Sequence, residues 1–327
     1  MIEYSNDKMD FFGRKTDSMY KIGIDLGGTN ITGGVIDNSN EIIEKENILT
    51  RHNSEPELIA ADIARMVFRF AAKLNISMSA FDKIGIGIPG SVEGAIVKDA
   101  NNIGFYDVEF ASMVRARTGL PVYLINDANA AARGEYVAGS GKGAKSFFML
   151  TLGTGIGGAY IYKGDIVEGC NLAAGEIGHM VIRVDGRQCS CGRRGCFEAY
   201  CSATALSTRA REAAITNQFS LLNKLTNNNL YKIDGKLFFQ ALKEGDKTCS
   251  EIFDQYMRDL TAGVVNIINL LQPDVLAIGG GLSGVGSLLL DNLKARVMKE
   301  VYSVHSDIQT SIRIASLGND AGIIGAV

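Results

Sequence analysis

A strand-like segment, a glycine turn and a second strand-like segment occur in this order twice in the chain. Residues 22–38 read IGIDLGGTNITGGVIDN, and residues 147–164 read FFMLTLGTGIGGAYIYKG. Self-similarity of this kind indicates a duplicated structural unit. Because strand patterns alternate with helical patterns after each copy, the sequence predicts two related α/β halves.

Apolar residues at helical spacing mark the helices of both halves. In the first half, three strand-like segments are followed by helix, strand, helix, strand and helix. Its helices are predicted over 55–75, 107–119 and 127–139, with a short strand over 122–125. In the second half, the sequence predicts helices over 202–216, 247–271 and 286–300, strands starting at 273 and over 311–315, and a short helix from Asp320.

The composition is that of a soluble globular protein long enough for two domains. The 327 residues are 46% hydrophobic and carry a net charge of −3. We therefore expect no nucleic-acid partner, and the absence of a long apolar run predicts no membrane span. Residues 1–18 lack the apolar stretch of a signal peptide, so we expect a peripheral extension and a cytoplasmic protein.

Three glycine turns each follow an apolar strand pattern. Glycine lets backbone N–H groups approach phosphate oxygens closely, and a Thr hydroxyl adds a donor. None is a P-loop or a dinucleotide fingerprint. Asp25, beside the first turn, would hold Mg²⁺ or hydrogen-bond the turn backbone, and both roles stay open. The residues predicted to bind phosphate are Gly27, Gly28, Thr29, Asn30, Gly153, Thr154, Gly155, Gly280 and Gly281.

One His and three Cys lie within residues 175–200, GEIGHMVIRVDGRQCSCGRRGCFEAY. His179, Cys189, Cys191 and Cys196 form a full tetrahedral set for Zn²⁺, the alternative being free thiols. A closed set leaves no position for water, so we expect a structural zinc rather than a hydrolytic one. Cys170, Cys201 and Cys249 are expected to be small apolar fillers.

Eight segments of the chain occur in the order seen in ROK-family sugar kinases, which the sequence from about residue 19 to 327 resembles. They are DLGGTN, IGIPGSVEG, NNIGFYD, INDANAAARGE, LGTGIGGA, GEIGHM, CSCGRRGCFE and IGGGLS. The resemblance implies the actin/hexokinase-like, ribonuclease H-like fold: two lobes, duplicated α/β domains and a central cleft. It also implies ATP with Mg²⁺ and phosphorylation of a sugar. Family repressors carry a helix-turn-helix, for which residues 1–18 are too few.

The resemblance also implies a division of labour between lobes. Residues 19–138 plus 320–327 would form the small lobe, with the first phosphate turn and the catalytic aspartate. Residues 139–319 would form the large lobe, with the zinc loop and the adenosine-side glycine turn. A homodimer is the state that the family suggests.

Asp127 is the candidate general base, because phosphoryl transfer to a hydroxyl needs a proton acceptor. It follows a predicted strand, where α/β sheets bind ligands, although Asp also suits a helix N-cap. A sugar further needs groups that donate and accept hydrogen bonds. The sugar-binding residues that the resemblance implies, besides Asp127, are Gly90, Asn102, Asn126, Glu176, His179 and Glu198.

The resemblance points to glucose among the sugars. Family fructokinases replace one of the cysteines with a second His, whereas PGSVEG and NNIGFYD resemble glucokinase segments. We expect phosphorylation of D-glucose to glucose 6-phosphate. An N-acetylmannosamine kinase and a non-catalytic sugar-binding regulator are the alternatives.

Overall fold

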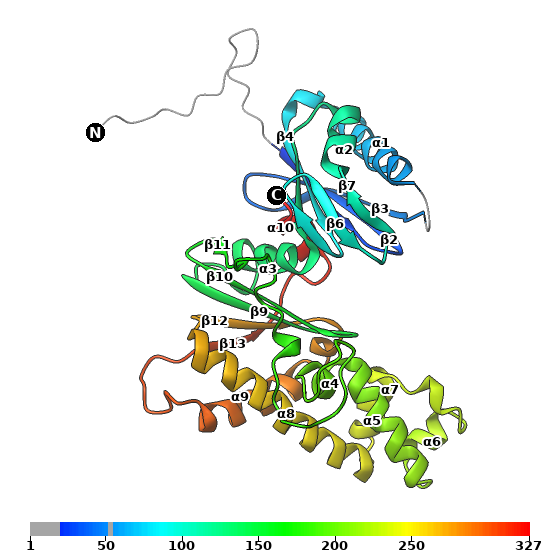
Figure 1. Cartoon of the computed structure of the whole chain (residues 1–327), viewed down its shortest axis with the longest axis vertical. Coiled ribbons are helices and arrows are strands. Elements are labelled where there is room, and N and C mark those ends of the chain that lie inside the picture. The colour runs from blue at the N-terminus through cyan, green and yellow to red at the C-terminus, as the bar shows by residue number, and fades with distance from the viewer. Residues whose placement is uncertain (1–19, 52–54) are drawn as a thin grey trace. The chain divides into compact units, whose positions relative to one another are not determined.

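The structure, a computed structural model, describes residues 20–51 and 55–327, so the expected extension 1–18 lies outside the described residues. The chain divides into two compact units (Figure 1). Unit 1 holds the described residues up to Ala138 together with Asn319–Val327, and unit 2 holds Gly139–Gly318. Each unit has its own hydrophobic core.

A five-stranded sheet is the centre of unit 1. Its order is β3-β2-β1-β4-β8. β1 runs antiparallel to β2 and parallel to β4, and β4 runs parallel to β8. The carboxyl ends of β1, β4 and β8 therefore share one edge. The strand bounds are Tyr20–Leu26 (β1), Asn30–Ile36 (β2), Ile42–Leu49 (β3), Phe81–Ile88 (β4) and Val122–Asn126 (β8).

The sheet of unit 2 repeats this plan. Its order is β11-β10-β9-β12-β13, with β9 antiparallel to β10 and β12 parallel to both β9 and β13. The duplication predicted from the two glycine turns is thus present as two sheets of the same topology. The strand bounds are Ser146–Leu152 (β9), Ile156–Tyr162 (β10), Asp165–Ile166 (β11), Val275–Gly279 (β12) and Ser311–Ile314 (β13).

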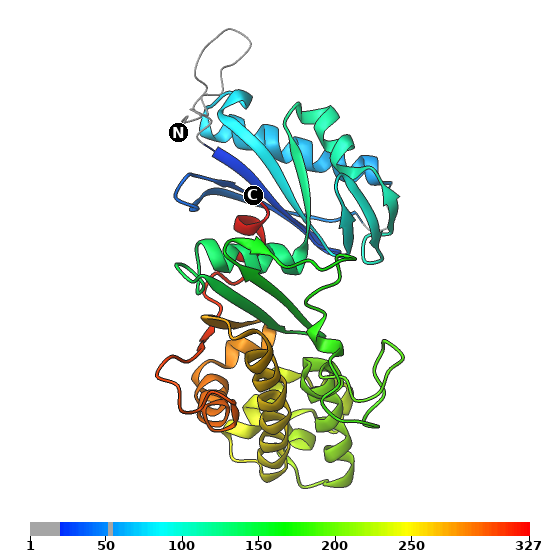
Figure 2. The same ribbon diagram turned by 60° about the vertical axis from the view of Figure 1, so that its left-hand side comes forward.

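Helices α1 (Pro56–Leu74) and α2 (Phe110–Thr118) cover one face of the first sheet, as Figure 2 shows. Pro56 suits the first turn of α1, and Asn75 ends the helix in the left-handed conformation. Buried residues such as Ile59, Ile63 and Phe70 recur at helical spacing and form the face toward the sheet.

Helices α3 (Asp127–Val137) and α10 (Asp320–Gly325) pack against each other. In the first sheet, α3 contacts β4, and α10 contacts β1 and β4. Their backbones approach closely: a Cβ on Gly325 would lie 1.7 Å from the Ala130 carbonyl oxygen, and one on Gly134 would lie 2.0 Å from that of Ala321. Only glycine fits at such a crossing. This packing fixes α3, which begins with Asp127.

A small antiparallel sheet of unit 1 was not predicted. It contains β5 (Ser91–Glu93), β6 (Ile96–Ala100) and β7 (Phe105–Val108). The helix predicted over 107–119 therefore begins only at Phe110, because Val108 pairs with Val97 in this sheet. Strands this short carry too few residues to show a clear alternation in the sequence.

Helices α8 (Lys247–Leu271) and α9 (Ser287–Glu300) lie on one face of the second sheet (Figures 1 and 2). α8 has the predicted bounds, and its N-cap Asp246 accepts a hydrogen bond from the backbone N–H of Cys249 at 2.7 Å. The remaining helices of unit 2 are α4 (Glu198–Cys201), α5 (Ala203–Thr216), α6 (Leu221–Leu225) and α7 (Gly235–Lys243).

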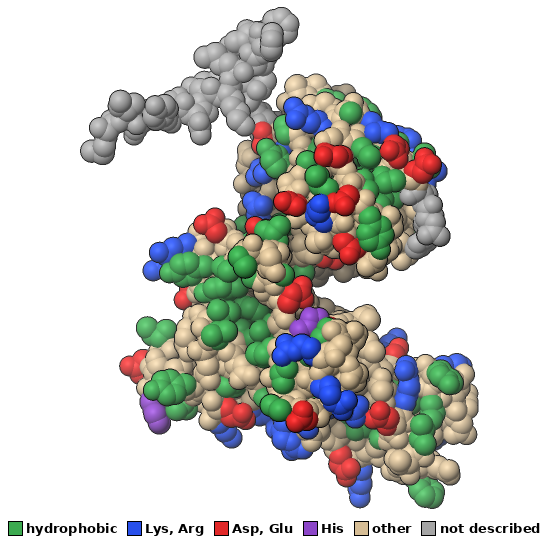
Figure 3. All heavy atoms as spheres, in the orientation of Figure 1, with side chains coloured by type: hydrophobic (Ala, Val, Ile, Leu, Met, Phe, Trp, Pro, Cys, Tyr) green, Lys and Arg blue, Asp and Glu red, His purple; other side chains and the backbone are tan. Residues whose placement is uncertain are grey.

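No helix within residues 20–51 and 55–327 is long and apolar enough to cross a membrane. Acidic and basic side chains are interspersed on the face drawn in Figure 3. Cys201 and Cys249 are buried as expected, whereas Cys170 is exposed. The expectation that Cys170 fills an apolar core is therefore wrong, because the loop that carries it lies on the surface.

Candidate active site

Two aspartates meet at the carboxyl edge of the first sheet. Asp25 is near the end of β1, and Asp127 begins α3 directly after β8. Burial raises the pKa of Asp25, and the neighbouring charge of Asp127 raises it further. Partial desolvation also raises the pKa of Asp127, although the residue as a whole is exposed; its Oδ1 accepts a hydrogen bond from the Ala128 N–H at 2.8 Å, which opposes the rise. Each carboxyl group thus holds a proton more readily than a free aspartate.

Asn126, rather than Asp127, caps helix α3. Its Oδ1 accepts a hydrogen bond from the backbone N–H of Asn129 at 3.1 Å, and its Nδ2 donates to the Gly90 carbonyl at 3.0 Å. The capping role considered for Asp127 therefore falls to its neighbour. One acceptor site and one N–H of the Asn126 amide remain for a ligand.

Gly90 has a structural reason to be glycine. A Cβ at this position would lie 2.0 Å from the Asp99 carbonyl oxygen of β6. The close approach lets the Gly90 carbonyl accept the hydrogen bond that orients Asn126. A direct contact of Gly90 with a sugar stays a prediction.

The first glycine turn is held by Thr50, a residue that the sequence patterns did not single out. The Gly27 N–H donates to the Asn30 carbonyl at 2.9 Å, and the buried Thr50 hydroxyl donates to the Gly27 carbonyl at 2.6 Å. A Cβ at Gly28 would lie 3.1 Å from the Asn102 carbonyl oxygen. The turn therefore brings its backbone beside Asn102.

The second glycine turn is fixed by the start of α5. The Ala203 N–H donates to the Gly153 carbonyl at 2.8 Å, and the Thr204 hydroxyl donates to the Thr154 carbonyl at 2.7 Å. These two bonds fasten the turn between β9 and β10 to the first residues of α5.

The third glycine turn lies beside the second because β12 pairs with β9. Gly280 has a φ of 81°, and a Cβ there would lie 2.5 Å from the Leu152 carbonyl oxygen. Only glycine combines this conformation with this close approach.

A pocket of about 780 Å³ borders the third glycine turn. Its lining is mostly apolar, with amide and ammonium groups of α7 among the polar members, and its size is that of a small-molecule site. The third glycine turn and the first residue of α5 also line the pocket. Lining residues include Ala203, Phe239, Gln240, Lys243, Gly281 and Gly284.

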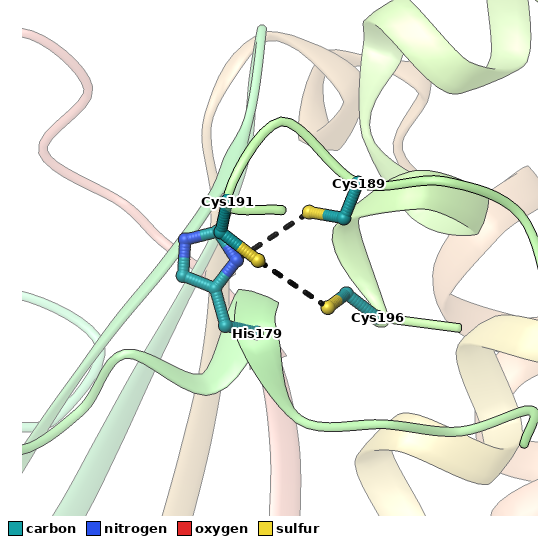
Figure 4. A group of neighbouring side chains, drawn as sticks. All are labelled: His179, Cys189, Cys191 and Cys196. Carbon is teal, nitrogen blue, oxygen red and sulfur yellow. Dashed lines mark hydrogen bonds between the residues drawn. The ribbon is translucent and has the colours of Figure 1, made fainter. Parts of the chain in front are cut away.

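The four predicted zinc ligands come together in unit 2 (Figure 4). Each offers one ligand atom, and these atoms all lie within 4.8 Å of one another. His179 Nδ1 lies 3.6 Å from Cys189 Sγ, and Cys191 Sγ lies 3.7 Å from Cys196 Sγ. Nε2 of His179 has no hydrogen-bond partner in the described part of the chain.

These separations fit a tetrahedral zinc ion. Zinc bond lengths of about 2.3 Å to sulfur and about 2.0 Å to nitrogen imply ligand atoms about 3.8 Å (S–S) and about 3.5 Å (N–S) apart. A donor set of one imidazole and three thiols is also typical of structural zinc. The residues therefore fit the metal that the sequence predicted.

Two of the thiols have opposite surroundings. The backbone N–H of Arg193 lowers the pKa of the exposed Cys191 thiol, whereas burial raises the pKa of Cys196 to about 12. A bound cation would deprotonate both.

Glu198 joins the metal cluster to the second glycine turn. Its Oε2 accepts a hydrogen bond from the Ile156 N–H at 2.9 Å, and its Oε1 accepts from the Ser190 hydroxyl at 3.4 Å. Ser190 stands between the ligands Cys189 and Cys191 in sequence. Glu176 is exposed and directly precedes the short helix Ile177–His179. Glu176, His179 and Glu198 therefore all belong to one structured loop region.

The candidate residues thus form two groups, one in each unit. Unit 1 holds the aspartate pair, the first glycine turn and the amides of Asn102 and Asn126. Unit 2 holds the other two glycine turns, the pocket and the metal cluster. The two sheets of one topology, with glycine turns in corresponding places, have the actin/hexokinase-like fold.

Comparison with known families agrees with this fold class. The model of the ROK family matches residues 21–327. A glucokinase of Halalkalibacterium halodurans is 36% identical over 93% of this chain and 92% of its own length. The chain belongs to the ROK family.

Solved structures and further sequence relatives that resemble this chain carry several different functions in their names. A Streptomyces griseus ROK glucokinase in complex with glucose and AMPPNP is 33% identical, with a TM-score of 0.75 over 94% of this chain and 97% of that chain. A candidate N-acetylmannosamine kinase of Listeria monocytogenes is 26% identical, with a TM-score of 0.73 over 94% and 97%. The xylose repressor of Bacillus subtilis is 28% identical over 94% of this chain and 75% of its own length.

Proposed function

We propose that this protein is an ATP-dependent hexose kinase that phosphorylates the 6-hydroxyl of D-glucose. The observation that carries the proposal is the carboxylate pair of Asp25 and Asp127 at the carboxyl edge of the first sheet. The identity to glucokinases over nearly the whole chain supports glucose as the acceptor.

Asp127 is proposed as the general base. Phosphoryl transfer requires that the attacking hydroxyl lose its proton as the new bond forms. Asp127 suits this role because its carboxylate is free of the capping bond, and because its raised pKa strengthens it as a base. Asn126 and Asn102 would orient the sugar with their remaining hydrogen-bonding groups.

Asp25 and the glycine turns are proposed to bind Mg²⁺-ATP. When bound, the cation would neutralise phosphate charge as it develops in the transition state. Asp25 would supply an oxygen ligand, directly or through water. The N–H groups of the two turns that are not bonded within the turn, those after Gly27 and Gly153, would be offered to the phosphates. The pocket beside Gly281 has the size and the largely apolar lining that an adenine base requires.

The zinc site is proposed to serve sugar binding by geometry. His179, Cys189, Cys191 and Cys196 would hold the ion and close its coordination sphere, so the metal itself does no hydrolysis. His179 would use Nδ1 for the metal, which leaves Nε2 for a sugar hydroxyl. Glu176 and Glu198 flank the ligands and would contact the same sugar.

A panel of sugars tests the proposal. ADP release from Mg²⁺-ATP would be measured with glucose, mannose, fructose, allose, N-acetylglucosamine and N-acetylmannosamine, and ³¹P NMR would locate the phosphate on the product. We expect highest kcat/KM with glucose and a 6-phosphate. Preference for N-acetylmannosamine would support the alternative that the Listeria relative suggests. Sugar binding without turnover would instead indicate a regulator.

A further inference from the structure

The zinc loop is also attached to the core of unit 2 at a second place, away from the metal ligands. Asp259, in the middle of α8, is 3% exposed and accepts hydrogen bonds from two arginines. Arg183 Nε donates to Oδ1 at 3.0 Å, and Arg209 Nη2 donates to Oδ2 at 2.7 Å. The Asp259 carboxylate thus accepts from the loop with one oxygen and from helix α5 with the other.

The same two guanidinium groups lie over one aromatic ring. Arg183 is 5.0 Å and Arg209 is 5.3 Å from the ring centroid of Tyr200, which is buried. Both distances are in the range of cation–π contacts. The Tyr200 hydroxyl accepts a hydrogen bond from the Arg187 N–H at 2.6 Å. Tyr200 therefore contacts the loop at Arg183 and Arg187 together.

These contacts are made by the segment that carries the four candidate metal ligands. Arg183 and Arg187 lie between His179 and Cys189, and Tyr200 lies two positions after Glu198 in α4. The loop folds back on itself, since the Gly195 N–H donates to the Arg187 carbonyl at 2.8 Å and Val181 pairs with Cys196. Holding Arg183 therefore also holds the returning segment with Cys196.

The charge balance makes this attachment costly to break. A buried carboxylate is stable only when it is paired, and Asp259 has both arginines as partners. Arg209 is itself buried, and its Nη1 has no hydrogen-bond partner among the residues that the structure describes. Arg183 is different, because its side chain is 44% exposed. Removal of Arg183 should therefore loosen the loop while the buried Arg209–Asp259 pair persists.

We propose that Arg183, Tyr200 and Asp259 are positioning residues that hold the segment from His179 to Glu198 independently of the metal. We call these three residues the clamp. Its role in sugar positioning rests on the function proposed above, since His179 and Glu198 are sugar contacts only if that function is right. The clamp and the metal would act as two anchors of one loop. Loss of either should loosen the loop, and only loss of both should release it.

Arg183→Gln is the variant that tests the clamp, with Arg258→Gln as its matched control. Arg258 is also ion-paired with a carboxylate of α8, Asp254, but its side chain is 55% exposed and it bonds no loop residue among those described. Two readouts need no sugar: the rate of zinc loss from the full-length protein to excess 4-(2-pyridylazo)resorcinol, and amide hydrogen exchange of residues 180–197 in the zinc-stripped protein.

We expect Arg183→Gln to lose zinc about tenfold faster than wild type, the factor that corresponds to one lost charge-assisted hydrogen bond. Exchange of residues 180–197 should also be faster in the stripped variant than in the stripped wild type. The glucose KM should rise by a similar factor while the ATP KM stays within about twofold. Arg183→Lys, which keeps the cation over Tyr200, should lie between wild type and Arg183→Gln, and Arg258→Gln should match wild type.

Zinc loss and exchange equal to those of Arg258→Gln would overturn the clamp even if the protein is an active glucokinase. Faster zinc loss with an unchanged glucose KM would overturn the positioning role. A wild-type protein that phosphorylates no sugar would overturn the proposed function instead, and the two sugar-free readouts would still decide whether the clamp holds the loop.

Discussion

The Oε2 atom of Glu198 accepts a hydrogen bond from the backbone N–H of Ile156 at 2.9 Å. Glu198 ends the metal-binding loop, and Ile156 directly follows the second glycine turn. One side chain therefore couples the loop proposed to bind sugar to the turn proposed to bind phosphate. A carboxylate in this position can still accept further hydrogen bonds, so the coupling does not exclude a ligand.

Gly155→Ala should disturb this coupling. A Cβ at Gly155 would lie 2.4 Å from Glu198 Oε2, so the flexible carboxylate must move and lose the Ile156 N–H. We expect the glucose KM to rise about tenfold, with a small change in Tm because only a side-chain end is displaced. Steady-state kinetics and thermal unfolding measure the two effects. Ser190→Ala, which removes only the long 3.4 Å contact, should change the KM less than about twofold.

His179 has two separable roles in this account. His179→Ala should lower the zinc content below that of wild type and raise the glucose KM at least about tenfold. His179→Cys should restore four thiolate ligands and the zinc, but not the KM, because the Nε2 group proposed to bind a sugar hydroxyl is still missing. The zinc content and the glucose KM of both variants measure the two roles. A normal glucose KM in His179→Cys would show that His179 serves the metal alone.

The pocket beside the third glycine turn should take the nucleotide base. Gly284 lines it, has no positive φ, and would place a Cβ in open space. Gly284→Phe should therefore fold normally and fill part of the pocket, which raises the ATP KM about tenfold or more without changing the glucose KM. An increase in the glucose KM alone would place the base elsewhere.

The aspartate pair should make the protein less stable as it ionises. In the folded protein Asp25 has a pKa above its ordinary value of 3.8, so between 3.8 and the raised pKa the folded state holds more protons than the unfolded state. The free energy of unfolding therefore falls as pH rises through this interval.

Asp25→Asn should consequently raise Tm at pH 7, and the gain should vanish below pH 3.8, where the aspartate is protonated in both states. Thermal unfolding from pH 3.5 to pH 7.5 measures this difference. Asp37→Asn is the control, since Asp37 lies on an exposed turn, bonded to the N–H groups of Ser39 and Glu41. Equal Tm values for Asp25→Asn and wild type at pH 7 would contradict the cost assigned to burial.

The sequence predicted most long elements and the family, because their signals are local. The glycine turns follow apolar strands, and α8 has regular helical spacing over its whole length. The grouping of His179 with the three cysteines was predicted from ligand chemistry, and the structure brings these side chains together.

What the sequence did not predict depends on contacts between distant segments. Thr50 supports the first glycine turn only because β3 runs beside β2, and the amide of Asn126, the cap of α3, is oriented by the distant Gly90 carbonyl. The strands of residues 91–108 were too short to recognise, and the clamp at Asp259 joins residues of three separate elements. The ligand roles of the site residues stay predictions.

The most direct test of the central claim is the turnover of Asp127→Asn with glucose and Mg²⁺-ATP. Removing a general base should lower kcat by about 10²–10⁴-fold, while glucose affinity, zinc content and Tm at pH 7 are retained or improved. Asp37→Asn, the same change on an exposed turn of unit 1, should keep the wild-type kcat. A kcat of Asp127→Asn within about tenfold of wild type would contradict the assignment of Asp127 as the base.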